Sequence, residues 1–518
     1  MKVNNLDLGK MFQFKAERYG DRVALVQGDR RITYLELYEY ANKIAHSLVN
    51  VGVKRGDRIL VALKNRLETV ALYWGVQIVG AVFTPVNFRF TADEISFVLD
   101  NSGSVAVAFE RASEESVRKA TNGRNVILIG VDSDGSVSID ITRLENCSKE
   151  PYKREDMSVY EYALMLYTSG TTGRPKGVPR THENEYSAAV AHIIQNNYEE
   201  YESTISVMPL YHTMGMRSML SMAMLGGKMV MVPDYDSITL LKTIQDEKIT
   251  CLYLVPTMYH DMLHSPELNN FDISSLTKIG YAGAAMTKSL TQLCFDIIRP
   301  RVFVNHFGST EVYTHTICNY LNRKPACAGK AGFNQMVRLV KLDGNELAGP
   351  EDLVSKKEIG QVIVNISSSE AFKGYWNNEA ATKFAIRDGW YFTKDMGYMD
   401  DDGDIFLVGR ADDMIISGGE NIYPLEVEDV LAKHPAVKEV AVIGLPDSRW
   451  GEIVVAVVVR DSEVTEEELD SYFIETSGLA RFKRPRKYIF ADSLIKSGSG
   501  KIMRRMIREL YMNQKEEN

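Results

Sequence analysis

The sequence predicts an α/β protein with two domains. The large N-terminal domain is expected to contain parallel-rich sheets covered by helices and a β-barrel-like subdomain, and the small C-terminal domain is expected to be α+β. Three observations support this prediction. The 518 residues exceed what one ordinary core accommodates. Strand and helix patterns alternate between residues 58 and 109, and shorter strands replace them after Lys341.

The alternation begins near the N-terminus. Apolar residues between Ile32 and Val53 recur with helical spacing, and Thr33 is a plausible N-cap. The segments that follow are expected to be strands at residues 58–63, 81–85 and 105–109, and helices at 68–79 and 91–100. This order is typical of a parallel sheet with helices on both faces. The polar stretch from Asp132 to Glu155 is expected to be a surface connection.

The remaining elements follow from the same patterns. A helix is expected at residues 183–195, with Tyr186, Val190, Ile193 and Ile194 on one face. Strands are expected at residues 163–167, 250–255, 278–281, 302–305, 360–366, 389–395 and 404–408. We place the domains at residues 1–411 and 412–518. The second domain is expected to contain helices at 424–433, 465–476 and 503–511, and strands at 437–443, 453–459 and 487–490.

Composition excludes several classes of protein. A net charge of −9 argues against a nucleic-acid binder that depends on phosphate contacts. The five cysteines show no metal-ligand spacing, which suits reduced thiols in the cytoplasm. We find neither a signal peptide in residues 1–15 nor an apolar run suited to crossing a membrane. A homodimer is the default expectation for a soluble enzyme.

The segment from Tyr167 to Val178 has the composition of a phosphate-binding loop. It follows an apolar strand and combines glycines with hydroxyl and cationic side chains. Its candidate contact residues are Thr168, Ser169, Gly170, Thr171, Thr172, Gly173, Arg174 and Lys176. It is not a Walker loop, because Gly177 follows Lys176 where that pattern requires Ser or Thr. A solvated hinge loop is the structural alternative, and it leaves the four hydroxyls unexplained.

Two later strands end in residues suited to a nucleotide. Gly283, Ala284 and Ala285 form a small-residue turn that lets a flat ring approach the backbone. The strand that ends near Asn305 opens into a segment containing Gly308 and Glu311. A carboxylate at that position could hold magnesium, although a helix-start residue would be the more frequent role of a lone glutamate.

The methionine-rich segment from Met208 to Met224 has two interpretations. Methionines fill irregular apolar space, so the segment could equally be core or the wall of an acyl pocket. His212 could be a structural histidine or a substrate contact, and Arg217 could simply face solvent.

Several separate motifs, in this order, resemble one family, the adenylate-forming enzymes. The motifs are Tyr167–Val178, Gly308–Glu311, Tyr391–Asp395, Gly409–Glu428 and Gly498–Lys501. Within that family the chain is most similar to acyl- and aryl-CoA ligases of the 4-chlorobenzoate type. Two positions depart from the pattern, since Phe307 replaces the usual Tyr and Ile495 replaces the usual Pro.

The resemblance implies a two-step reaction with ATP, Mg²⁺ and coenzyme A. A carboxylic acid displaces pyrophosphate from ATP to give acyl-AMP, and the CoA thiol then accepts the acyl group. The C-terminal domain is implied to rotate between the steps about a hinge at Asp412, because one site cannot hold both Lys501 and the thiol.

The resemblance also assigns roles by position. Lys501, Thr310, Glu311 and His212 are the implied catalytic residues, with Glu311 as the metal ligand. Gly283, Ala284, Ala285, Phe307 and Gly308 would bind adenine, and Asp395 and Arg410 the ribose. Gly418, Gly419, Trp450, Arg484 and Arg486 would bind CoA. His212, Met214, Met216, Ala282 and Tyr313 would line the acyl pocket.

The acid is expected to be apolar, either aromatic or medium-chain aliphatic, from the Met, Ala and aromatic content of that pocket. Arg217, Tyr313 and His315 leave room for a polar group or a second carboxylate. A stand-alone enzyme that loads an acyl or aryl acid onto a carrier protein is the main alternative. A luciferase-like oxygenase would share the nucleotide residues, and intact Lys176, Glu311 and Lys501 argue against a non-catalytic binder.

Overall fold

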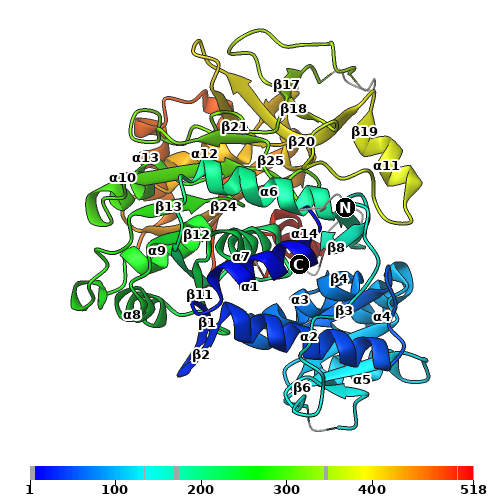
Figure 1. The fold of residues 1–518 in the computed structure, drawn as a ribbon. Coiled ribbons are helices and arrows are strands. Elements are labelled where there is room, and N and C mark those ends of the chain that lie inside the picture. The colour runs from blue at the N-terminus through cyan, green and yellow to red at the C-terminus, as the bar shows by residue number, and fades with distance from the viewer. Residues whose placement is uncertain (1–5, 134, 169–173, 343–347, 499, 517–518) are drawn as a thin grey trace.

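The computed structural model describes the chain except residues 1–5, 134, 169–173, 343–347, 499 and 517–518 (Figure 1). Its largest sheet has seven strands in the order β7-β6-β5-β3-β4-β8-β9. These strands are β3 (Arg58–Ala62), β4 (Val82–Pro85), β5 (Ala106–Glu110), β6 (Ile127–Val131), β7 (Ile139–Asp140), β8 (Tyr162–Thr168) and β9 (Lys176–Thr181). Neighbours run parallel except at the β8–β9 pair, which is antiparallel.

Helices cover both faces of this sheet because alternate strand residues point to opposite sides. Ile59 and Val61 of β3 pack with α1 (Leu8–Tyr19), α2 (Tyr34–Asn50) and α3 (Leu67–Val79) in one core. Leu60 and Ala62 pack with α4 (Ala92–Ser102) and α5 (Glu114–Thr121) in another. The expected N-cap Thr33 is confirmed, since it forms a capping box with Glu36 at the start of α2.

Two further sheets complete the middle of the large domain. One has the order β10-β11-β1-β2 and the other β12-β13-β14-β15-β16. Their strands are β1 (Val23–Gln27), β2 (Arg30–Thr33), β10 (Ser203–Ser206), β11 (Lys228–Met231), β12 (Cys251–Leu254), β13 (Lys278–Tyr281), β14 (Val302–Phe307), β15 (Thr316–Cys318) and β16 (Lys330–Ala331). The associated helices are α6 (His182–Gln195), α7 (Thr213–Leu225), α8 (Ser237–Glu247), α9 (Pro256–Leu263) and α10 (Lys288–Ile297).

An antiparallel sheet follows where shorter strands were expected. It contains β17 (Val337–Val340), β18 (Gly360–Asn365), β19 (Ile386–Arg387), β20 (Trp390–Met399) and β21 (Ile405–Arg410), with α11 (Glu379–Ala385) beside it. The expected barrel-like shape is wrong for the residues that the structure describes. Their strands form the open order β17-β18-β20-β19, with β21 also on β20, and the end strands β17 and β19 do not pair with each other.

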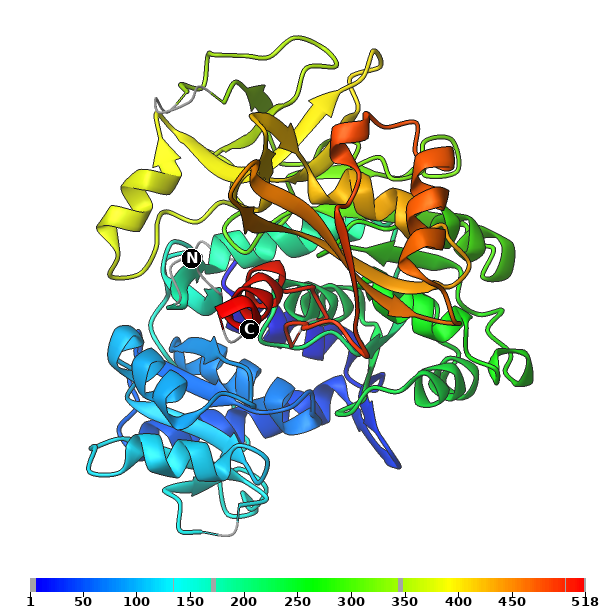
Figure 2. The ribbon, with the colours of Figure 1, turned by 180° about the vertical axis from the view of Figure 1, so that it is seen from behind.

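The C-terminal segment builds its own sheet, in the order β23-β22-β25-β24 with β26 beside β25. Its elements are β22 (Ile415–Ser417), β23 (Glu420–Ile422), α12 (Pro424–Leu431), β24 (Val437–Asp447), β25 (Gly451–Arg460), α13 (Glu466–Thr476), β26 (Lys487–Phe490) and α14 (Arg504–Glu516). One face packs on α12 and α13, and the other face packs on α14. In Figure 2 these orange and red elements lie across the face turned away in Figure 1.

The predicted elements of the sequence analysis are confirmed to within a few residues. Helices α1, α8, α9 and α10 were not expected. Of the apolar residues expected on one face of α6, Tyr186, Val190 and Ile193 pack partly buried against the core. Ile194 is 44% exposed, and Ala188, Ala189 and His192 are the more deeply buried residues. In the described part of the chain, every helix is too short or too polar to cross a membrane.

Candidate active site

The predicted phosphate loop connects two strands of the largest sheet. Thr168, half-buried at the end of β8, lies opposite Lys176 at the start of β9. Ser169, Gly170, Thr171, Thr172 and Gly173 lie outside the described residues. Beside the hairpin is a pocket of about 420 Å³ whose lining includes Arg174, Lys176 and Trp376. The sheet therefore presents the loop cations at an open concave surface.

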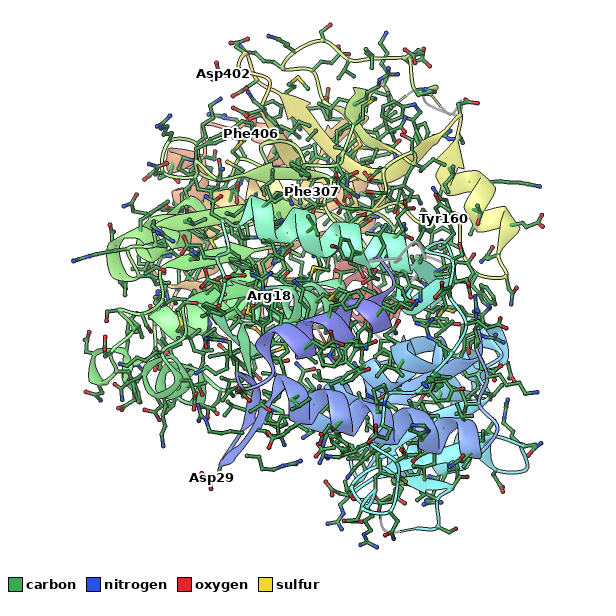
Figure 3. All side chains as sticks on the ribbon, in the orientation of Figure 1. Arg18, Asp29, Tyr160, Phe307, Asp402 and Phe406 are labelled. Atoms are coloured by element: carbon green, nitrogen blue, oxygen red, sulfur yellow. The ribbon has the colours of Figure 1, made fainter. Side chains whose placement is uncertain are left out.

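The end of β14 supplies the second motif. A Cβ on Gly308 would lie 1.8 Å from the carbonyl oxygen of Tyr313, so only glycine fits this turn. The ring of Phe307 meets the ring of His315 edge to face, with centroids 4.9 Å apart. In Figure 3, Phe307 lies toward the middle of the molecule, whereas Asp29 lies at the tip of the β1–β2 hairpin.

Glu311 follows in this loop and is 7% exposed. Its Oε1 accepts a hydrogen bond of 2.7 Å from the hydroxyl of Tyr375. The ring of Tyr375 in turn lies 4.9 Å from Nζ of Lys176. Tyr375 thus joins the predicted metal ligand to the phosphate loop. No hydrogen bond to the second carboxylate oxygen of Glu311 occurs among the described residues, and a carboxylate oxygen is a suitable ligand for a hard cation. Thr310, the neighbouring predicted catalytic residue, is half-buried in the same loop.

The predicted ribose-binding residues meet across two paired strands. Asp395 of β20 lies opposite Arg410 of β21, and their side chains form an ion pair of 2.9 Å. Burial raises the pKa of Asp395, whereas the charge of Asp395 raises the pKa of Arg410. The pair fixes the direction in which both side chains point.

The loop that carries Lys501 is docked against the large domain. The backbone N–H of Ser497 donates to the carbonyl of Lys501, which closes the turn. A Cβ on Gly498 would lie 2.6 Å from Nδ2 of Asn87 and 2.9 Å from the hydroxyl of Tyr211. A Cβ on Gly500 would lie 3.4 Å from Val255. The turn that carries Lys501 therefore lies against residues of the large domain.

The charges around Lys501 come from the predicted nucleotide site. Desolvation lowers the pKa of Lys501, and Arg410 lowers it further, whereas Asp395 and Asp413 oppose the shift. The residue keeps solvent-exposed surface, while its ammonium lies among protein groups that displace part of its water.

Small residues line the adjoining surface of the large domain. Gly283 has a φ of +84° and is exposed together with Ala284 and Ala285. A Cβ on Gly283 would lie 3.9 Å from the sulfur of Met214. Ala282, one residue earlier, is buried. The predicted adenine turn and this part of the predicted acyl pocket are therefore adjacent.

The other predicted acyl-pocket residues differ in position. His212 is the N-cap of α7, its ring lies tilted at 51° beside the ring of Tyr211, and burial lowers its pKa to about 4. Tyr313 is buried and donates to Glu185 over 3.0 Å. Met216 is fully buried in the core formed with α1 and α3, which favours the core interpretation at that position.

The predicted hinge residue makes one ion pair. Nζ of Lys394 lies 3.1 Å from the carboxylate of Asp412, in the segment that joins β21 to the C-terminal sheet. Lys394 has a φ of +66°, which is costly for a residue with a side chain. Both features lie where a rotation of the C-terminal domain would act.

The predicted CoA residues are only partly brought together. Gly418 lies against Trp450, since a Cβ on Gly418 would be 2.8 Å from the indole ring, and Gly419 follows it. The guanidinium of Arg486 stacks 4.4 Å above Trp450. Arg484 instead binds both carboxylate oxygens of Asp470.

Sequence reasoning missed several residues of the site. Tyr375 and Asn87 have no motif of their own, because only the fold brings them to Glu311 and to the Lys501 turn. Lys394 lies within the Tyr391–Asp395 motif, but its ion pair with the hinge residue was not predicted. Tyr253 and Arg180 were likewise not singled out. The strand of Tyr253 was predicted, but its partner Arg217 lies 36 residues away. No strand was predicted at Arg180, which lies in β9 and binds Glu185 at the start of α6.

Solved structures share this arrangement over nearly the whole chain. The structure of ATP-bound MatB from Rhodopseudomonas palustris has a TM-score of 0.88 at 28% identity and covers 98% of this chain and 99% of its own. An o-succinylbenzoate CoA synthetase from Bacillus subtilis, in complex with an acyl-adenylate intermediate, has a TM-score of 0.83 at 28% identity, covering 96% and 97%. The fold and the site define a two-domain adenylate-forming enzyme.

The chain belongs to the AMP-binding enzyme family. The AMP-binding enzyme model matches residues 12–376, and the model of the AMP-binding enzyme C-terminal domain matches residues 426–501. A 2-succinylbenzoate–CoA ligase of Bacillus cereus is 32% identical over 95% of this chain and 96% of its own length. A long-chain-fatty-acid–CoA ligase of Mycobacterium tuberculosis is 31% identical over 93% and 94%.

Proposed function

We propose that this protein is an ATP-dependent acid–CoA ligase that forms acyl-AMP with release of pyrophosphate and then transfers the acyl group to the thiol of CoA. The observation that carries the proposal is the docked turn of Lys501, whose charge environment contains Asp395 and Arg410. The family and the similar CoA ligases support both half-reactions.

In the first step the chain places positive charge where negative charge develops. Attack of the carboxylate on the α-phosphate creates negative charge on the phosphate oxygens, which the ammonium of Lys501 stabilises. Thr310 contacts the same phosphate, and Lys176 with Thr168 and the rest of the loop receives the pyrophosphate. Glu311 would hold Mg²⁺, whose charge helps neutralise the phosphates. Asp395 and Arg410 orient the ribose, and Gly283, Ala284, Ala285 and Phe307 enclose adenine.

In the second step the C-terminal domain, residues 412–518, turns about Asp412. The Lys394–Asp412 pair would break or re-form during this turn, since it joins the two sides of the hinge. Gly418 and Gly419 then line the path of the pantetheine thiol, and Trp450 with Arg486 supports the CoA nucleotide. Arg484 must first leave Asp470 to join them.

The acid has an apolar body, either aromatic or aliphatic, that lies beside His212, Met214, Ala282 and Tyr313. We also propose that the enzyme works as a homodimer in the cytoplasm, and the five free cysteines suit that reducing compartment.

The decisive experiment supplies ATP, Mg²⁺, CoA and a panel of acids and measures pyrophosphate, AMP and acyl-CoA. We expect all three products to accumulate together. Pyrophosphate release without any acyl-CoA would instead favour a carrier protein as the acyl acceptor. No pyrophosphate with any acid would contradict the proposal.

A further inference from the structure

Arg217 is a buried cation without a bound carboxylate. It lies on α7 and is 2% exposed. Its Nη1 donates to Oγ1 of Thr314 over 2.6 Å, and its Nη2 donates to the hydroxyl of Tyr253 over 2.5 Å. Its Nε has no partner among the described residues. Removing a guanidinium from water costs free energy, and hydrogen bonds to neutral hydroxyls offset only part of that cost.

The hydroxyl groups add further donors to the same place. Because Thr314 and Tyr253 each accept a bond from Arg217, each hydroxyl must direct its own proton elsewhere. Neither proton meets an acceptor within the described part of the chain. Three N–H or O–H donors therefore gather around one positive charge with no anion bound to it. This donor set matches a carboxylate, which accepts several hydrogen bonds.

The other charged groups nearby do not replace that anion. Glu370 acts on Arg217 through space, and its carboxylate is engaged elsewhere, since Oε1 accepts from Asn334. Burial raises the pKa of Glu370, which weakens it as a counterion. The rings of His192 and His306 lie 4.7 Å and 5.1 Å from the ring of Tyr253, and burial followed by Arg217 lowers both their pKa values well below the usual value.

Arg217 lies inward from the reacting end of the site. α7 begins next to Tyr211, which touches the docked Lys501 turn, and Met214 lies beside Gly283. Arg217 follows Met214 by about one helical turn on the same side of α7. The segment after Glu311 leads to the same place, because Thr314 follows Glu311 by three residues and accepts a hydrogen bond from Arg217. An acid whose reacting carboxylate lies near Lys501 would extend toward the guanidinium.

We infer that Arg217, Thr314 and Tyr253 form a subsite for a second carboxylate, so that the preferred substrates are dicarboxylic acids. This inference rests on the proposed function and sharpens its substrate class. The apolar residues near Met214 contact the body of the acid, and the guanidinium binds its far end. Only the carboxylate beside Lys501 is activated, because Arg217 binds the other one.

The test compares matched acids in the pyrophosphate-release assay. One series contains α,ω-dicarboxylic acids from three to six carbons and benzene-1,2- and benzene-1,4-dicarboxylic acid. The other contains the monocarboxylic acids of equal length, benzoic acid and the monomethyl esters of the diacids. We expect at least one diacid to exceed its ester and its monoacid about 10- to 100-fold in kcat/KM, as loss of a charged hydrogen bond predicts.

Variants assign the difference to the subsite. In Arg217→Met, kcat/KM for the preferred diacid should fall about 10- to 100-fold, mainly through KM, while the monoacids are used at least as well as before. Tyr253→Phe keeps the guanidinium and should give a smaller loss with the same selectivity. Met224→Leu, at a buried position of the same helix, should change neither series. Melting temperatures of all variants separate misfolding from lost recognition.

The outcomes distinguish the two proposals. Equal or better use of monoacids by the natural enzyme overturns the subsite and leaves the ligase activity standing. Equal loss of both series in Arg217→Met and in Tyr253→Phe also overturns it. Absence of pyrophosphate with every acid contradicts the ligase activity itself and removes the subsite with it.

Discussion

Two buried arginines lie near one tyrosine ring, and the surroundings of their charges differ. The guanidinium carbons of Arg180 and Arg217 are 3.7 Å and 5.4 Å from the ring centre of Tyr313. Arg180 forms an ion pair of 2.8 Å with Glu185 and donates to backbone carbonyls, including that of Glu370. Among the described residues, Arg217 donates hydrogen bonds to two hydroxyls and to no carboxylate.

This difference assigns different roles to the two arginines: Arg180 stabilises the fold, and Arg217 is proposed to bind a substrate. Glu185 neutralises Arg180 inside the fold and also accepts from Tyr313, so the pair fixes the position of that ring. Arg180 keeps one nitrogen without a partner, which shows that an unsatisfied atom alone does not mark a ligand site. What marks Arg217 is the lack of a carboxylate within its hydrogen bonds.

We expect the largest difference between the two arginines in the free energy of unfolding of their methionine variants. Arg180→Met leaves Glu185 buried without its cation and should cost about 3–5 kcal/mol of unfolding free energy. Arg217→Met leaves no charged partner behind and should cost clearly less. Urea unfolding of both variants measures the difference, with Arg55→Met as the control. That residue pairs with Glu161 at the surface, where loss of a pair costs about 0–1 kcal/mol. Equal costs for Arg180→Met and Arg217→Met would assign both arginines to structure.

Lys501 is a third cation of the site. It differs from Arg180 and Arg217, because neither a buried ion pair nor buried hydroxyls hold it. It is exposed and close to Asp395 and Asp413, and its turn belongs to the C-terminal segment. Lys501→Ala should slow adenylation about 10²- to 10³-fold, because a charge aimed at the developing negative charge is lost. Use of preformed acyl-AMP with CoA should change little.

The control for this prediction is in the same turn. Lys496→Ala removes a lysine that pairs with Glu439 within the C-terminal domain, and it should leave both half-reactions nearly intact. Pyrophosphate release and acyl-CoA formation are measured separately. Equal losses in both half-reactions of Lys501→Ala would remove the role assigned to the lysine.

Much of this arrangement could be predicted from local sequence. The phosphate loop, the Gly308–Glu311 segment and the Lys501 turn each lie in one continuous stretch with a recognisable composition. Asp395 and Arg410 were also found, since each belongs to a family motif. Their direct pairing became visible only in the register of β20 and β21.

The proposed subsite for the second carboxylate could not be predicted in the same way. Arg217 is surrounded in sequence by methionines and serines, and its partners Tyr253 and Thr314 are 36 and 97 residues away. No spacing rule links these positions. In α6 the apolar pattern likewise did not reveal that Glu185 and His192 are fully buried, because the partners of Glu185 lie outside the helix.

A buried histidine differs from these buried cations, because burial keeps its ring neutral. Burial lowers the pKa of His182 from 6.5 to about 4, and its Nδ1 accepts the backbone N–H of Leu8. Between pH 4 and pH 6.5, His182 is therefore protonated in the unfolded chain and neutral in the folded chain. Stability is therefore fully present above pH 6.5 and is lost as the pH falls toward 4, by about 3 kcal/mol for this group.

Urea midpoints between pH 7.5 and 4.5 test this dependence. His182→Asn offers an acceptor to Leu8 without a titrating ring, so its stability should fall less steeply with acid than that of the natural protein. His264→Asn, at an exposed position, should keep the natural slope. A natural slope in His182→Asn would show that other groups cause the acid sensitivity.

The smallest effect concerns Tyr375, whose hydroxyl binds Glu311. Tyr375→Phe removes the bond of 2.7 Å but keeps the ring beneath Lys176. Loss of one such bond is worth about 1 kcal/mol, so the Mg²⁺ concentration for half-maximal adenylation should rise about fivefold. Tyr398→Phe, on a ring stacked against Phe406, is the control. If Mg²⁺ dependence stays natural in Tyr375→Phe, the hydroxyl does not orient a metal-binding carboxylate. Glu311 would then resemble Glu185, a carboxylate whose role is to hold the fold.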